Sequence, residues 1–283
     1  MNDILFDLND IRFEISFKSY NELRSILSFY KKNFLCKINL PCKNTLKKDF
    51  LLDSIRISRT EFPTIDIIPH FSILHEFRRN STNTKNSFND FLHMVKDYGC
   101  NEVLLISGSK KRSTLDSVSI LNSFQYNPLF NNSSFSIGVA FNPYLPDFLF
   151  EEEILRLEKK LQSGIVNSIW IQFGTDIHLI ECRIKILKNI ILSSLKYKTS
   201  LSDIKLFGSI LIPSNQFLAR FKFRPWKGVY CSQDFLESVD YANNLVSELL
   251  KTYKQHNICP IIETNILNDD QLNSLRMILH LKN

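Results

Sequence analysis

The chain has 283 residues, of which 44% are hydrophobic and 23% are charged, and its formal net charge is +6 at pH 7. This composition is typical of a globular protein, and the basic residues are too dispersed to predict a nucleic-acid-binding patch. No apolar run reaches the roughly 18 residues that a membrane helix needs. The acidic start, MNDILFDLND, is unlike a signal peptide. We therefore expect a cytoplasmic protein that binds neither membranes nor nucleic acid.

The cysteines are scattered and form no CxxC motif. They lie at positions 36, 42, 100, 182, 231 and 259. Zinc sites and disulfide frameworks use closely or regularly spaced cysteines, so this pattern predicts reduced thiols and no metal site.

The first patterned segment is residues 11–16 (IRFEIS), where apolar and polar residues alternate. It predicts a strand with Phe13 and Ile15 on one face and Glu14 on the other. Residues 20–32 have helical spacing, whereas the lysine-rich residues 33–50 predict no element. Short apolar runs typical of buried strands follow at residues 53–58, 64–70, 102–106, 135–142, 167–173, 204–212 and 258–264. Helical patterns occur at residues 88–98, 115–124, 150–163, 176–194, 214–223, 235–256 and 269–281. Polar loops are predicted at residues 78–87 and 127–134.

Residues 135–173 show the repeating unit most clearly. A strand ends at Asn142-Pro143, a helix follows with glutamates at its start and lysines near its end, and Gly164 stands just past that helix. A second apolar run comes next, so this segment is a βαβ unit with parallel strands.

Eight strands with intervening helices predict a (β/α)8 TIM barrel that spans residues 1–283 as a single domain. An open doubly wound sheet is the alternative, but the first turn lacks the GxGxxG motif that would favour it.

Active sites of such barrels lie at the C-terminal ends of the strands. Glu14 is the one carboxylate at the predicted strand ends, where partial burial would suit a general acid, and His70 ends an apolar strand. A structural ion pair for Glu14 and a structural hydrogen bond for His70 remain open alternatives.

Short motifs stand in chain order on the predicted strands. They are Phe13-Glu14, PHFS at 69–72, EVLLISGS at 102–109, residues 136–143 with 157–164, residues 171–176, GSILIPSN at 208–215 and residues 264–265. In the same order they resemble FEFFPP, PHLT, vLaLRGD, isvAayPe…LkrKvdAGA, TQfffD, GILPvsN and YTLNR of the flavin-dependent methylenetetrahydrofolate reductases. The chain therefore resembles this β/α-barrel family over most of its length.

The resemblance implies that Glu14 donates a proton and that a nicotinamide, NADH or NADPH, supplies reducing equivalents through FAD. It implies FAD contacts for Ser58, His70, Ser107, Gly108, Ser109, Glu153 and Lys160. It implies folate contacts for Gln172, Gln216 and Phe217.

The chain also departs from the family pattern. Ser107-Gly108-Ser109 replaces Arg-Gly-Asp, Ile266 replaces a terminal arginine, and residues 142–147 shorten the YPEVHPEA stretch. The basic residues 110–112 could supply charge nearby, or form a solvated loop. We expect weak FAD binding, because neutral donors replace a guanidinium.

The first functional hypothesis is therefore an FAD-dependent methylenetetrahydrofolate reductase of one-carbon metabolism and methionine biosynthesis. The alternatives are a flavin-free, folate-binding one-carbon transferase and an inactive folate- or partner-binding barrel. The sequence leaves a homo-oligomer open.

Overall fold

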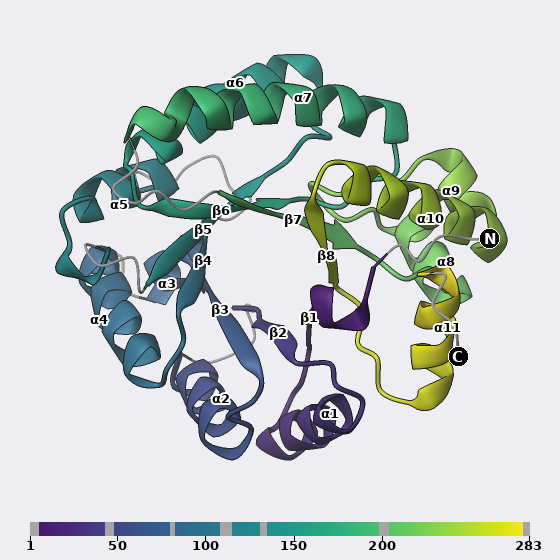
Figure 1. The fold of residues 1–283 in the computed structure, drawn as a ribbon, viewed down its shortest axis with the longest axis horizontal. Coiled ribbons are helices and arrows are strands. Elements are labelled where there is room, and N and C mark those ends of the chain that lie inside the picture. Colours follow the sequence, from purple (N-terminus) through teal and green to yellow (C-terminus); the bar gives the residue numbers. More distant parts are fainter. Residues whose placement is uncertain are drawn as a thin grey trace.

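The computed structural model describes residues 6–42, 48–79, 83–107, 115–130, 135–197 and 204–279. Eight parallel strands pair in chain order and close into a barrel, because β8 also pairs with β1 (Figure 1). The predicted (β/α)8 barrel is confirmed, and the open sheet is excluded. The strands are β1 (Arg12–Glu14), β2 (Lys37–Leu40), β3 (Asp66–Ser72), β4 (Glu102–Ile106), β5 (Ser136–Phe141), β6 (Val166–Ile171), β7 (Lys205–Ile210) and β8 (Ile258–Ile262).

In the described part of the chain, α-helices form a ring outside the strands (Figure 1). They are α1 (Tyr20–Lys32), α2 (Lys48–Glu61), α3 (Ile73–Arg79), α4 (Thr84–Asp97), α5 (Ser117–Phe124), α6 (Asp147–Gln162), α7 (Ile177–Ser194), α8 (Asn215–Phe223), α9 (Gln233–Glu237), α10 (Val239–Gln255) and α11 (Asp269–Ile278). None of these helices is both long and apolar enough to cross a membrane.

The βαβ unit predicted in residues 135–173 is confirmed as β5, α6 and β6. The two strands pair in parallel, with Val139 opposite Ile169. Gly164 has a φ of 77° just after α6, a conformation that glycine adopts without steric cost.

The strand faces divide the core into two parts. Outward side chains pack against the helices, as where the Phe13 ring meets the Tyr30 ring of α1 edge-on at 5.4 Å. Inward side chains fill the lumen with a smaller cluster, Ile68, Leu104, Trp170, Phe207 and Ile261. This alternation settles which strand residues can reach the mouth of the barrel.

The prediction for the second strand is wrong. Residues 53–58 lie inside α2, and β2 lies within the segment for which no element was predicted. Buried Leu51, Ser54, Ile55 and Ser58 recur at helical spacing, whereas Ile55 and Ile57, two residues apart, suggested a strand.

Two further predictions need correction. The predicted loop at residues 78–87 is shorter, because α3 runs through Arg79 and α4 begins at Thr84. The single helix predicted at 235–256 is two helices, because the Ser238 side chain accepts a hydrogen bond from the Tyr241 N–H and so caps the start of α10.

Candidate functional site at the C-terminal mouth of the barrel

Glu14 and His70 meet at the mouth, as expected for a shared site. Phe13 of β1 and Ile15, directly after β1, are fully buried on the helix side of the strand, so Glu14 between them points inward. Its Oε2 lies 4.0 Å from Nδ1 of His70, and the two side chains are 21% and 4% exposed, respectively. A partly accessible carboxyl beside a buried imidazole is an arrangement that can hold and pass on a proton.

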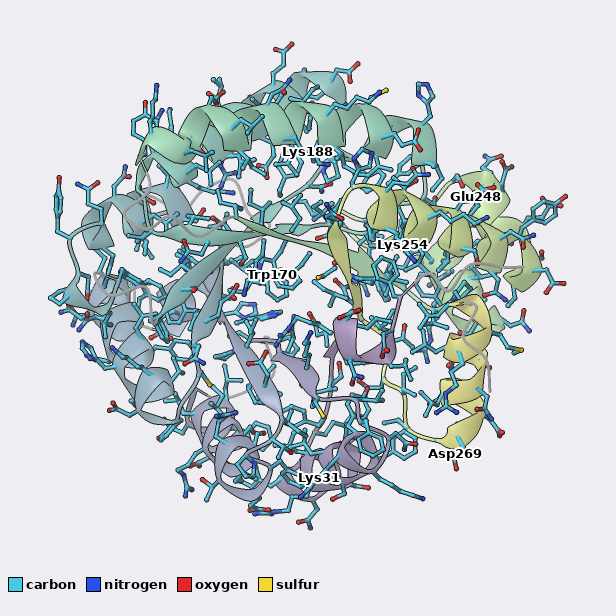
Figure 2. The ribbon with its side chains drawn as sticks, viewed as in Figure 1. Lys31, Trp170, Lys188, Glu248, Lys254 and Asp269 are labelled. Carbon is cyan, nitrogen blue, oxygen red and sulfur yellow. The ribbon has the colours of Figure 1, made fainter. Side chains whose placement is uncertain are left out.

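Trp170 of β6 lies inside the ring of strands (Figure 2). Its ring meets the His70 ring edge-on at 6.0 Å. Its Nε1 donates a 2.7 Å hydrogen bond to Ser168 Oγ, and that hydroxyl donates to the Glu102 carboxylate. A hydrogen-bonded chain therefore runs down the lumen from the mouth.

The lower end of that chain is the carboxyl of Glu102, a half-buried residue. Burial raises the pKa of Glu102, and the hydrogen bond from Ser168 opposes this shift. Glu102 thus belongs to the interior of the barrel and fixes Trp170 through Ser168.

Asn39 is a lumen residue that sequence reasoning missed, because it lies in the unassigned segment. Arg12 Nε donates a 2.9 Å hydrogen bond to Asn39 Oδ1, and Arg12 Nη1 lies 2.5 Å from Asp66 Oδ2. Since a guanidinium has donors and no acceptor, it fixes the orientation of the amide. Asn39 Nδ2 is buried and makes no hydrogen bond to the rest of the described chain. The alternation of Lys37–Leu40 was the signal that could have revealed this strand.

Gln172 follows β6 and is half-buried. Its backbone N–H donates a 2.9 Å hydrogen bond to the carbonyl of Phe141, which places it beside the end of β5. It is two residues beyond Trp170, so it belongs to the same rim as Glu14 and His70.

Ser107 directly follows β4 and has a hydrogen-bond network of its own. Its hydroxyl donates to Ser117 Oγ at 2.7 Å and accepts from the Ser117 N–H at 3.1 Å. Arg156 of α6, which sequence reasoning missed, also reaches it, with Nη2 at 3.4 Å. Gly108, Ser109 and the basic residues 110–112 lie outside the described residues.

Lys160 and Glu153 of α6 support the end of β5. Lys160 is 4% exposed, and its Nζ donates a 2.9 Å hydrogen bond to the carbonyl of Ala140. Burial lowers the pKa of Lys160. Glu153 Oε1 accepts from the Asn142 N–H at 3.3 Å. Both side chains are thus engaged with the strand and the loop after it.

The remaining predicted site residues do not join Glu14 and His70. Ser58 is not at a strand end as predicted, since it is buried in α2 and donates a 2.7 Å hydrogen bond to the Ser54 carbonyl. Gln216 is exposed on α8. Phe217 packs its ring against Trp226, with centroids 5.4 Å apart.

Two cavities lie elsewhere on the surface. One of about 700 Å³ is formed by α8, α9 and the segment between them, and its lining includes Phe221, Tyr230 and Leu236. Another of about 400 Å³ involves Asp10 and Cys259. Neither is lined by Glu14 or His70. The described residues contain no group of three or more His, Cys, Asp or Glu side chains placed to hold a metal ion.

No protein-family model and no curated protein matches this chain. Among solved structures it is similar to a protein from Clostridium thermocellum that binds two copies of 5-methyl-5,6,7,8-tetrahydrofolic acid. That match has 12% identity and a TM-score of 0.60, and it covers 95% of this chain and 93% of the other. The 4-hydroxy-tetrahydrodipicolinate synthase of Methylacidiphilum fumariolicum SolV has 11% identity and a TM-score of 0.48, with 95% and 77% covered. At 12% identity, the likeness to the Clostridium thermocellum protein shows a shared fold and nothing beyond it.

Proposed function

We propose that this protein binds a reduced folate at the mouth of the barrel and acts on its one-carbon unit, with Glu14 as the acid. The observation that carries the proposal is the Glu14–His70 pair, 4.0 Å apart, on strands that flank β2. Two further points support it. The order of the sequence motifs resembles methylenetetrahydrofolate reductases. The folate-binding protein from Clostridium thermocellum matches this chain along 95% of its length.

The specific reaction we propose is reduction of 5,10-methylenetetrahydrofolate. Glu14 gives its proton to N10, the bond between N10 and the methylene carbon breaks, and the methylene stays on N5 as an iminium. A hydride from NADH or NADPH then adds to that carbon and leaves a methyl group. His70, beside Glu14, passes the next proton to the carboxylate.

Three residues that the resemblance assigns to FAD are committed to other groups. Ser58 is bonded within α2, Lys160 Nζ to the Ala140 carbonyl, and Ser107 Oγ to Ser117. These residues do not fit the expected flavin site, so the reaction that we propose does not use FAD. Direct transfer of the hydride from the nicotinamide is the form of the reaction that we favour.

The test is an anaerobic assay of methylenetetrahydrofolate reduction with NADH or NADPH, with and without added FAD. We expect Glu14→Gln to lower kcat by about 10²–10⁴-fold while folate binding, measured by calorimetry, remains. The matched control is Glu248→Gln on α10, an exposed glutamate outside the barrel, which should keep the full rate (Figure 2).

Either of two results would change the proposal. An unaltered rate in Glu14→Gln removes Glu14 from the chemistry. Activity that depends on added FAD restores the flavin-dependent reductase as the better hypothesis.

Folate binding without turnover is the second candidate. It is favoured by the loss of both charged residues of the Arg-Gly-Asp motif at positions 107–109. In that case calorimetry finds folate binding, while no reduction is seen with either nicotinamide.

A further inference from the structure

A second pair of reactive side chains lies on the same rim. Cys42 follows β2, and His75 lies in the first turn of α3, directly after β3. Cys42 Sγ is 3.7 Å from His75 Nδ1, and both side chains are half-buried. The strand before Cys42 lies between the strands of Glu14 and His70, so the pair stands at the mouth of the barrel.

The geometry suits activation of the thiol. When the imidazole hydrogen is on Nε2, Nδ1 can accept the Sγ proton, and a thiolate beside an imidazolium results. The thiolate, rather than the thiol, is the form that attacks electrophilic sulfur. We propose that Cys42, activated by His75, is a thiol modification site that forms mixed disulfides with low-molecular-weight disulfides.

The other cysteines provide an internal contrast. Burial raises the pKa of Cys100 to about 12 and that of Cys231 to about 12, and it also raises the pKa of Cys259. These thiols are poor nucleophiles near neutral pH. Cys182 is exposed on α7 and serves as the reference for an accessible thiol.

The reaction balances without a further oxidant. His75 Nδ1 takes the Sγ proton, and the Cys42 thiolate attacks one sulfur of the small disulfide. A new S–S bond forms, the original S–S bond breaks, and the proton passes to the departing thiolate. The adduct would stand on the rim shared with Glu14 and His70.

The experiment compares cysteines within one protein. The ligand-free full chain is treated with oxidised glutathione at pH 7, and modification of each cysteine is followed by peptide mass spectrometry. We expect Cys42 to react about tenfold faster than Cys182, although Cys182 is the more accessible thiol. We expect Cys100 to stay unmodified, which also shows that the protein remains folded.

Two variants isolate the role of His75. His75→Asn should reduce the Cys42 rate below that of Cys182, because an amide cannot take up the thiol proton. His93→Asn makes the same change at an exposed histidine of α4 and should leave the rate unaltered. A Cys42 rate no higher than that of Cys182, or one unaffected by His75→Asn, would overturn the proposal. No folate is present, so the result is independent of the proposed function.

Discussion

Replacing Gly138 by alanine tests how the lumen beneath the mouth is packed. A Cβ at this position of β5 would lie 2.4 Å from Trp170 Nε1 and 2.5 Å from Ser168 Oγ, closer than real Cβ contacts. Trp170 is 5% exposed and packs in the lumen cluster with Leu104 and Phe207. The methyl group must therefore push Trp170 and Ser168 off their present positions.

The expected loss of stability follows from two contributions. Overpacking a close-packed core costs about 1–3 kcal/mol. Displacing Trp170 also disrupts its 2.7 Å hydrogen bond to Ser168, which contributes roughly 1 kcal/mol. We expect Gly138→Ala to lower the free energy of unfolding by about 2–4 kcal/mol in total.

Urea denaturation of wild type, Gly138→Ala, Trp170→Phe and the double variant measures this directly. Phenylalanine is smaller than tryptophan and has no indole N–H. Gly138→Ala should therefore lower the free energy of unfolding by about 1 kcal/mol less in the Trp170→Phe variant than in wild type. If the free energies of unfolding of Gly138→Ala and wild type differ by less than about 0.5 kcal/mol, the packing described for the lumen is wrong.

Two further predictions concern stability. Arg183, 5% exposed, bonds the carbonyls of Pro143 and Leu145 as well as Asp147, so Arg183→Met should cost roughly 2–4 kcal/mol in urea denaturation. Asp147 is 97% exposed, so Asp147→Asn should cost under about 1 kcal/mol; equal losses would contradict this reasoning. The pKa of Glu102 is raised in the folded state. Its contribution to the free energy of unfolding is therefore complete below its pKa in the unfolded chain, and it is lost as the pH rises through its pKa in the folded protein. Glu102→Gln should therefore gain stability relative to wild type as the pH rises through the folded-state pKa of Glu102, and a difference that stays constant with pH would argue against a raised pKa at this carboxyl.

Most of the barrel could be predicted because its strands and helices carry strong local patterns. The strand at Glu102–Ile106 and the helix at Tyr20–Lys32 were predicted with the bounds that the structure has. The alternation around Glu14 also predicted that this side chain lies on the opposite face of the strand from Phe13 and Ile15. These features depend on neighbours in sequence, which a periodic pattern records directly.

The second βα unit was missed because its signals are weak or misleading. The strand Lys37–Leu40 has four residues and begins with a lysine. The helix after it carries Ile55 and Ile57 two positions apart, which favours a strand locally. Pairing with β1 and β3 decides the outcome, and no local pattern reports that pairing.

The candidate site was predicted only in part, for a related reason. The strand-end rule brought Glu14 and His70 together, but it could not reveal side chains that reach the rim from helices, such as Arg156. Nor could it show that Lys160 would be used to hold the Ala140 carbonyl. These contacts depend on the distance between elements and on side-chain rotamers, which the sequence alone does not determine.

The proposed function places a reduced folate beside Glu14, His70 and Trp170. The chain has two tryptophans, so Trp226→Phe leaves Trp170 with the one indole N–H resonance in a proton–nitrogen NMR spectrum. Titration with 5-methyltetrahydrofolate under anaerobic conditions should shift this resonance in a saturable way, because the Trp170 ring lies 6.0 Å from the His70 ring at the mouth. If calorimetry of the same sample shows folate binding but the Trp170 resonance does not move, the ligand binds elsewhere. That result would contradict the proposed site at the mouth of the barrel.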